Sequence, residues 1–174
     1  RVSHSRVEVF DRCTNKYSLR YVEEIATIPN TDTDNALILG TALHTGIEEG
    51  VEQALDFYKN SFPVLTDDHI HEMMKMEAMI PKAKAKLPPG GTFELPIGNA
   101  DFIGFMDYLV PVGKGLKLDG LITGEDLNEF EAFDLYDFKY SSNSKNYAVS
   151  GQLHEYKYWY ELTHPGHRIR NMYF

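Results

Sequence analysis

The spacing of apolar residues changes from helical to strand-like at the loop Pro88-Pro89-Gly90-Gly91. Before this loop, apolar residues recur every three or four positions, which is typical of amphipathic helices. After it, segments rich in aromatic and β-branched residues are bounded by Gly, Asn and Asp, which favours strands. The change predicts an α/β fold, in which a mixed sheet follows N-terminal helices and is flanked by helices.

The expected elements follow from these two periodicities. Helices are predicted over residues 5–22, from about residue 36 to 58, over 67–80 and over 147–163; strands are predicted over 92–97, 101–110, 133–141 and 167–174. The order is therefore three helices, three strands, a helix and a strand. No internal repeat interrupts this order.

Local signals mark where the three N-terminal helices begin. Ser5 and Glu8 form a capping box for the first helix, because each side chain can satisfy an amide of the other. The second helix is expected to begin after Asp34 or Asn35, and the third after Thr66. Proline lacks an amide hydrogen, so we expect Pro81 to kink or end the third helix.

Length and composition limit the class of protein. The 174 residues fit a single domain over 1–174. Because the sequence begins without methionine, an excised or truncated fragment is the expectation. Cys13 is the only cysteine, which excludes an internal disulfide and any cluster held by several thiolates of this chain. No window reaches the roughly 18 apolar residues of a membrane span, and no leader is evident, so we expect a cytoplasmic protein with no membrane partner.

Charge is unevenly distributed along the chain. The formal net charge is −9, yet residues 1–21 and residues 138–174 each carry a net charge of +3. If the two ends lie together, they supply a basic surface for a phosphate backbone beside an acidic centre. The alternative is that the asymmetry reflects only solvated faces.

The triplet Asp137-Phe138-Lys139 follows an apolar strand segment. Alternation along a strand would point Asp137 and Lys139 to the same side. Metal-assisted hydrolysis needs hard oxygen ligands and a positive group near the attacking water, and this pair offers both. A second acid-x-Lys triplet, Glu155-Tyr156-Lys157, lies in a helical pattern where positions i and i+2 diverge, so we do not assign it to a site.

Asp107 stands in an apolar strand segment, shortly after Gly104. A buried carboxylate needs a partner, and metal coordination beside Asp137 would provide one. A salt bridge or an exposed strand end is the alternative. His44, in the second helix, is either a boundary residue of the core or a third ligand of the same centre.

Four motifs in register resemble the RecB-like branch of the PD-(D/E)XK nucleases, which includes CRISPR-associated and phage-type exonuclease domains. They are Gly-x-x-x-His at 40–44, Gly-x-x-Asp at 104–107, Asp-x-Lys at 137–139 and Gln-x-x-x-Tyr at 152–156. The N-terminal segment from Ser5 to Tyr17 also resembles the opening helix of that branch. The resemblance implies a restriction-endonuclease-like core of αβββαβ order with extra N-terminal helices.

The same resemblance implies roles for the site residues. His44, Asp107, Asp137 and the backbone carbonyl of Phe138 would hold Mg²⁺ or Mn²⁺. The ammonium of Lys139 would position or activate the attacking water, and Gln152 and Tyr156 would orient that lysine or grip the DNA backbone. No iron–sulfur cluster is expected, because the three C-terminal cysteines of cluster-bearing members are missing, and Cys13 is then a small core residue.

The function implied is a metal-dependent DNA nuclease, by family habit an exonuclease, in DNA processing, repair or recombination. Its substrate would be single-stranded DNA or duplex ends, and its partner a helicase or recombination protein. Two alternatives stay open: a catalytically silent nucleic-acid-binding module with a nuclease fold, and a metal-dependent phosphodiesterase for small substrates.

Overall fold

A computed structural model describes residues 1–28, 30–118, 127–140 and 150–174, with side chains for these ranges except 115–118 and 127–130. The chain divides into two compact units. Unit 1 comprises Arg1–Thr27, Gly90–Asp137 and Tyr147–Phe174, and unit 2 comprises Ile28–Pro89 and Phe138–Asn146. The chain therefore passes from unit 1 to unit 2 at the peptide bond between Asp137 and Phe138. The expectation of a single domain over 1–174 stays a prediction.

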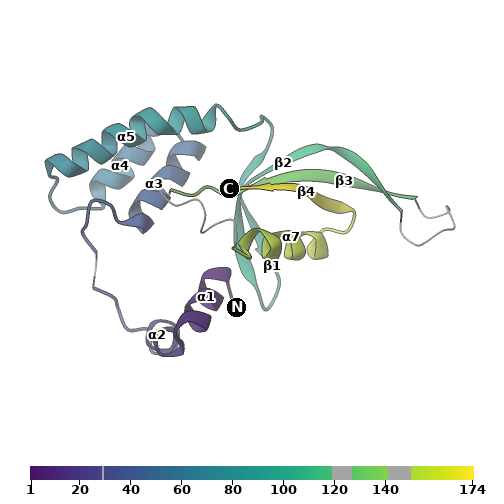
Figure 1. Cartoon of the computed structure of the whole chain (residues 1–174), viewed down its shortest axis with the longest axis horizontal. Coiled ribbons are helices and arrows are strands. Elements are labelled where there is room, and N and C mark those ends of the chain that lie inside the picture. Colours follow the sequence, from purple (N-terminus) through teal and green to yellow (C-terminus); the bar gives the residue numbers. More distant parts are fainter. Residues whose placement is uncertain (29, 119–126, 141–149) are drawn as a thin grey trace. The chain divides into compact units, whose positions relative to one another are not determined.

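Unit 1 contains a four-stranded mixed sheet of order β1-β2-β3-β4 (Figure 1). The strands are β1 (Thr92–Gly98), β2 (Ile103–Leu118), β3 (Leu127–Tyr136) and β4 (His167–Tyr173). β1 and β3 both pair antiparallel with β2, whereas β3 and β4 are parallel and are connected through α7 (Gln152–Thr163). A parallel pair needs such a crossover. The predicted α/β class is confirmed, including the order of three strands, a helix and a strand.

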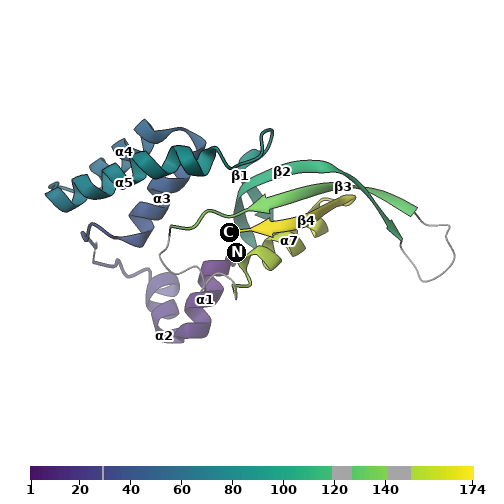
Figure 2. The ribbon, with the colours of Figure 1, turned by 45° about the horizontal axis from the view of Figure 1, so that its top comes forward.

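The β2–β3 pair differs from the prediction in length. β2 pairs with β1 as far as Leu109, but it continues alongside β3 to Leu118, opposite Leu127. The pair thus extends past β1 and β4 (Figure 2). At its other end β3 stops at Tyr136, so the strand predicted over 133–141 is confirmed for residues 133–136, but its continuation with alternation through Asp137 and Lys139 is wrong. Residue 141 lies outside the described residues. The amide of Asp137 still donates to the carbonyl oxygen of Tyr173 (2.9 Å), and residues 138–140 carry no strand.

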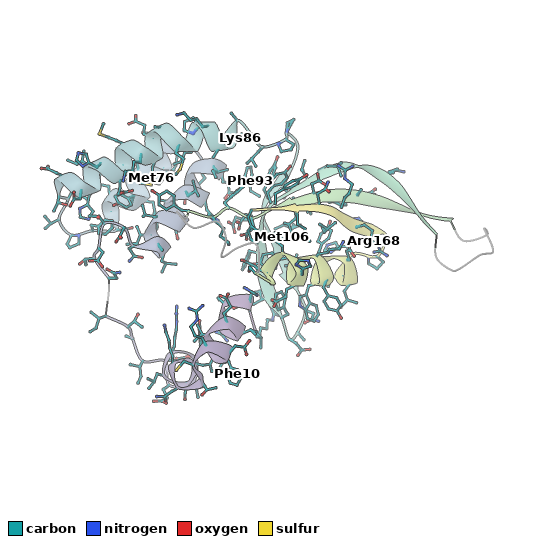
Figure 3. The ribbon with its side chains drawn as sticks, in the orientation of Figure 1. Phe10, Met76, Lys86, Phe93, Met106 and Arg168 are labelled. Carbon is teal, nitrogen blue, oxygen red and sulfur yellow. The ribbon has the colours of Figure 1, made fainter. Side chains whose placement is uncertain are left out.

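The core of unit 1 forms where α7 packs on the sheet. α7 contributes Leu153, Tyr156 and Tyr160, which recur at the spacing of one helix face. Met106, completely buried, is one of the sheet residues in the same cluster (Figure 3). Burying a large apolar side chain contributes about 1.5–3 kcal/mol, so this face holds α7 in place. The other buried members are Ile97, Phe102, Leu109, Leu135 and Ile169.

The N-terminal segment is not the single helix predicted over 5–22. It consists of α1 (His4–Arg12), α2 (Thr14–Tyr17) and a π-helical turn, η1 (Ser18–Val22). Cys13 separates α1 from α2, because its backbone is extended (φ −164°, ψ 103°). Ser3 is the N-cap of α1, so the capping box of Ser5 and Glu8 is also wrong.

The apolar residues of this segment do not form a core. No residue of α1, α2 or η1 is buried, and Phe10 is 50% exposed (Figure 3). Cys13 is exposed too, which corrects its expected place in the core. The thiol instead accepts a hydrogen bond from the amide of Lys16 (3.4 Å), which caps α2.

Unit 2 is helical in its described part and contains α3 (Ala36–Glu48), α4 (Val51–Asn60) and α5 (Asp67–Lys84). The predicted second helix is therefore two helices, separated at Gly50, whose φ of +134° suits only glycine. Of the two proposed caps, Asn35 is the one used, since its side chain accepts from the amide of Leu37 (3.0 Å). Within the described residues, no helix combines the length and the apolar composition that a bilayer span requires.

α5 begins as predicted and ends later than predicted. Thr66 is its N-cap and forms a capping box with His69. Pro81 does not end the helix, which continues to Lys84. The amide of Ala85 donates to the carbonyl oxygen of Pro81 (3.0 Å), so the last turn closes beyond the proline.

Candidate metal centre

Two carboxylates face each other across β1 and β2. The pairs Phe93–Tyr108 and Leu95–Met106 flank them, which places Glu94 opposite Asp107. One ligand oxygen of each residue lies within 4.8 Å of the other. Asp107 is buried (7% exposed), as its apolar strand predicts, whereas Glu94 is exposed.

Glu94 is not one of the residues that the sequence motifs single out. Its backbone has a φ of +49°, a conformation that few residues other than glycine adopt. Such strain at a position next to a buried carboxylate is typical of a functional site. The sequence signal was weak, because the register between two strands cannot be read from a single sequence.

Asp137 lies immediately after β3 and is only 1% exposed. Its carboxylate and that of Asp107 both act on the hydroxyl of Tyr156. Burial raises the pKa of Tyr156 to about 12, and the negative charges of Asp137 and Asp107 add to the increase. The two carboxylates and this tyrosine therefore share one locale in unit 1.

Gln152 joins the same locale from the first position of α7. Its amide nitrogen donates to the hydroxyl oxygen of Tyr156 (2.8 Å), a contact that the i, i+4 spacing on a helix allows. This hydrogen bond favours the ionised tyrosine and partly opposes the increase in pKa. Unit 1 thus brings together four of the residues that the sequence singled out: Asp107, Asp137, Gln152 and Tyr156.

Gly104 leaves room for the ring of Tyr156. A Cβ atom at position 104 would lie 2.9 Å from Cε1 of Tyr156 and 3.2 Å from Cε1 of Phe102. The first distance is shorter than real Cβ contacts. The glycine of Gly-x-x-Asp therefore lets α7 set its tyrosine close to the strand that carries Asp107.

His44 and Phe138 meet within unit 2. Nε2 of His44 lies 2.9 Å from the carbonyl oxygen of Phe138, and the two rings make an edge contact at 5.6 Å between centroids. α3 positions the imidazole, which is half-buried beside the buried Leu43 and Ile47. Two of the four predicted ligands thus lie together on unit 2.

Lys139 is half-buried and follows Phe138 in unit 2. Because β3 ends before Asp137, strand alternation does not decide where its ammonium lies. The second acid-x-Lys triplet has other contacts, as expected of a helix. Glu155 bonds to His4 of α1 (3.0 Å), and the ammonium of Lys157 donates to Glu161 and to the carbonyl oxygen of Ile169.

The donors of each unit are of types that bind hard divalent cations. Unit 1 offers carboxylate oxygens, and unit 2 offers a backbone carbonyl and an imidazole, which suit Mg²⁺ or Mn²⁺ better than a thiolate-loving metal. The close approach of Glu94 and Asp107 is favourable where a cation offsets their repulsion.

Residues 1–21 belong to unit 1, whereas the second basic end is divided: residues 138–146 belong to unit 2 and residues 147–174 to unit 1. The bond between His4 and Glu155 ties α1 to α7 (3.0 Å). Val2 also bridges to Phe102, at the start of β2. The basic surface for a phosphate backbone stays a prediction.

A family model described as the PD-(D/E)XK nuclease superfamily matches residues 1–174. No curated protein and no solved structure matches the chain. A family match over the full length implies a metal-dependent nuclease. The sheet, its flanking helices and the buried carboxylates agree with this assignment.

Proposed function

The chain belongs to the PD-(D/E)XK nuclease superfamily, and we propose that it is a DNA exonuclease of the RecB-like branch that hydrolyses phosphodiester bonds with Mg²⁺ or Mn²⁺. The observation that carries this proposal is the convergence of two buried carboxylates, Asp107 and Asp137, on the hydroxyl of Tyr156. The four RecB-like motifs supply these residues. The assignment to the RecB-like branch, the exonuclease activity and the preference for DNA are all part of the proposal.

The proposed metal ligands are His44, Asp107, Asp137 and the carbonyl oxygen of Phe138. Two observations support the set: His44 and Phe138 are 2.9 Å apart in unit 2, and Asp137 is bonded covalently to Phe138. Glu94, opposite Asp107, adds negative charge that favours a cation.

The residues around this centre divide the chemistry. A bound divalent cation would neutralise the phosphate and lower the pKa of the attacking water. Lys139 orients that water and stabilises charge that develops on the phosphate. Gln152 and Tyr156 grip the DNA backbone or orient the lysine, with the neutral tyrosine hydroxyl acting as a donor.

The biological setting belongs to the same proposal. We expect single-stranded DNA or duplex ends as substrate, a helicase or recombination protein as partner, and a cytoplasmic role in repair or recombination. The net charge of +3 at each end of the chain supports contact with a phosphate backbone.

Three variants test the division of roles. Asp107→Ala and Asp137→Ala should abolish both Mn²⁺ binding in calorimetry and cleavage of linear DNA in a gel assay. Lys139→Ala should bind Mn²⁺ normally and lose at least about a hundredfold in turnover, as expected when a charged transition-state contact is removed. Asp56→Ala and Lys59→Ala, exposed on α4, are matched controls that should change neither measurement.

Each alternative function predicts a different result. Unchanged Mn²⁺ affinity in Asp137→Ala would contradict the ligand assignment. DNA binding without cleavage in the parent protein would identify a silent binding module. Hydrolysis of a chromogenic phosphodiester that linear DNA does not inhibit would identify a small-substrate phosphodiesterase.

A further inference from the structure

Two side chains of unit 2 hold the segment that carries Lys139. On one side of the lysine, His44 of α3 contacts the carbonyl oxygen of Phe138 (2.9 Å). On the other side, the hydroxyl of Tyr140 donates to Oε2 of Glu72 on α5 (3.2 Å). Residues 137–140 carry neither helix nor strand, so regular backbone pairing does not fix the lysine.

Glu72 is placed to act as a fixed acceptor. Its side chain is 15% exposed, and its second oxygen, Oε1, pairs with Lys75 one turn later on α5. An ion pair this exposed adds little stability, but it orients the carboxylate. The acceptor for Tyr140 is therefore presented by a helix rather than by a loop.

A buried tyrosine lies close to the same pair. Tyr58 of α4 is completely buried, and its hydroxyl donates to the carbonyl oxygen of Thr33 (2.8 Å). Glu72 and Tyr140 both act electrostatically on this hydroxyl. The anchor of Tyr140 thus lies beside a completely buried residue of unit 2.

We propose that Tyr140 and Glu72 are positioning residues for Lys139, which hold the backbone of the lysine from its C-terminal side as His44 holds it from its N-terminal side. The inference rests on the proposed function only for the role of Lys139. Consecutive Cα atoms are about 3.8 Å apart, so anchors at the two neighbours leave the lysine backbone little freedom. A displacement of about 1 Å at a reacting group can cost about a hundredfold in rate.

Tyr140→Phe removes the hydroxyl and keeps the ring. We expect kcat on linear DNA to fall about tenfold, while KM, Mn²⁺ affinity and the melting temperature stay unchanged. Glu72→Ala should have the same effect, whereas Glu72→Gln should restore most of the activity, because an amide oxygen still accepts from Tyr140. Glu77→Gln, exposed on the same helix, is the control and should have no effect.

A double-mutant cycle shows whether the effect acts through the lysine. In single-turnover assays, adding Tyr140→Phe to Lys139→Ala should cause no further loss, because the group that it positions is gone. A tenfold loss in both backgrounds would overturn the inference. If Lys139→Ala is fully active, the proposed function fails instead.

Hydrogen exchange tests the anchor without relying on activity. In a peptide that ends at Tyr140, Tyr140→Phe and Glu72→Ala should speed exchange of the backbone amides at least severalfold, and Glu77→Gln should not. Unchanged exchange in both variants would overturn the inference even in an inactive protein.

Discussion

Tyr156 connects the chemistry of the candidate centre with the stability of unit 1. Tyr156 is a buried residue of α7. Its hydroxyl accepts a hydrogen bond from Gln152 and interacts electrostatically with Asp107 and Asp137. Burial and the two negative charges oppose ionisation of the hydroxyl, whereas the hydrogen bond from Gln152 favours it. The tyrosine therefore keeps its proton at a pH where an exposed tyrosine loses it.

This difference predicts a loss of stability at high pH. The unfolded chain releases the proton near pH 10, whereas the folded chain holds it to about pH 12, so stability falls as the pH rises between these values. Tyr156→Phe should remove its share, about 1–2 kcal/mol by pH 11.5, and make the decline shallower. Urea unfolding across this range measures the slope.

Tyr158→Phe is the control for that experiment, because Tyr158 is 61% exposed on the same helix. The slope with pH is compared rather than stability at one pH, because losing the bond to Gln152 lowers the stability of Tyr156→Phe at every pH. Equal slopes for the parent protein and Tyr156→Phe would show that the environment of Tyr156 is not as described.

At the scale of elements, two glycines of α3 meet opposite surroundings. A Cβ atom at Gly46 would lie 2.5 Å from Cδ1 of Ile80 and 2.9 Å from Cβ of Ala54, whereas a Cβ atom at Gly40 meets nothing within 4 Å. The end of Ile80 can turn away, but the Cβ of Ala54 moves only with the backbone of α4. Gly46 therefore sets how closely α3 and α4 approach.

Alanine at these positions should change stability in opposite directions. Gly46→Ala should lower the free energy of unfolding by about 1–3 kcal/mol through overpacking. Gly40→Ala should raise it by roughly 0.5–1 kcal/mol, because alanine is the better helix former. Chemical denaturation of the two variants measures both, and a stabilised Gly46→Ala would contradict the close packing of α3 and α4.

Periodicity was sufficient to predict which type of element each segment forms, but not where elements break. Cys13 interrupts a regular apolar spacing with one extended residue, and Gly50 divides what reads as a continuous helical pattern. Pro81 shows the converse, since its helix continues for three more residues. These outcomes depend on packing against other elements, which no local pattern contains.

Those residues of the candidate centre that stand out from their neighbours in the sequence could be predicted. Asp107 and Asp137 stood out as carboxylates in or beside apolar segments, and both are buried. Glu94 could not be predicted, because only the register between β1 and β2 places it opposite Asp107. The contacts that hold Tyr140 also join residues far apart in the sequence, so only the structure reveals them.

At the scale of the whole molecule, the proposed ligands come from three separate parts of the sequence: α3, β2 and the segment that follows β3. A cation that binds only the folded chain stabilises it by mass action. The proposal therefore makes the metal a contributor to stability as well as to catalysis.

Metal titration should reveal this linkage. With Mn²⁺ at about a hundred times its dissociation constant, the free energy of unfolding should rise by about 2.7 kcal/mol. Asp137→Ala should lose this increase, whatever its stability without metal, and His71→Ala, exposed on α5, should keep it. An equal increase in Asp137→Ala would mean that the cation binds elsewhere.

The contact between His44 and residue 138 uses an oxygen that every amino acid possesses. Changing the phenylalanine to another residue would remove the ring packed against the imidazole and leave that oxygen in place. A sequence motif specifies side chains only, so it accepts any residue at this position, although the backbone carbonyl there makes a specific contact. Replacing the amide that follows residue 138 with an ester, which weakens the oxygen as an acceptor, would reach an atom that ordinary mutagenesis cannot.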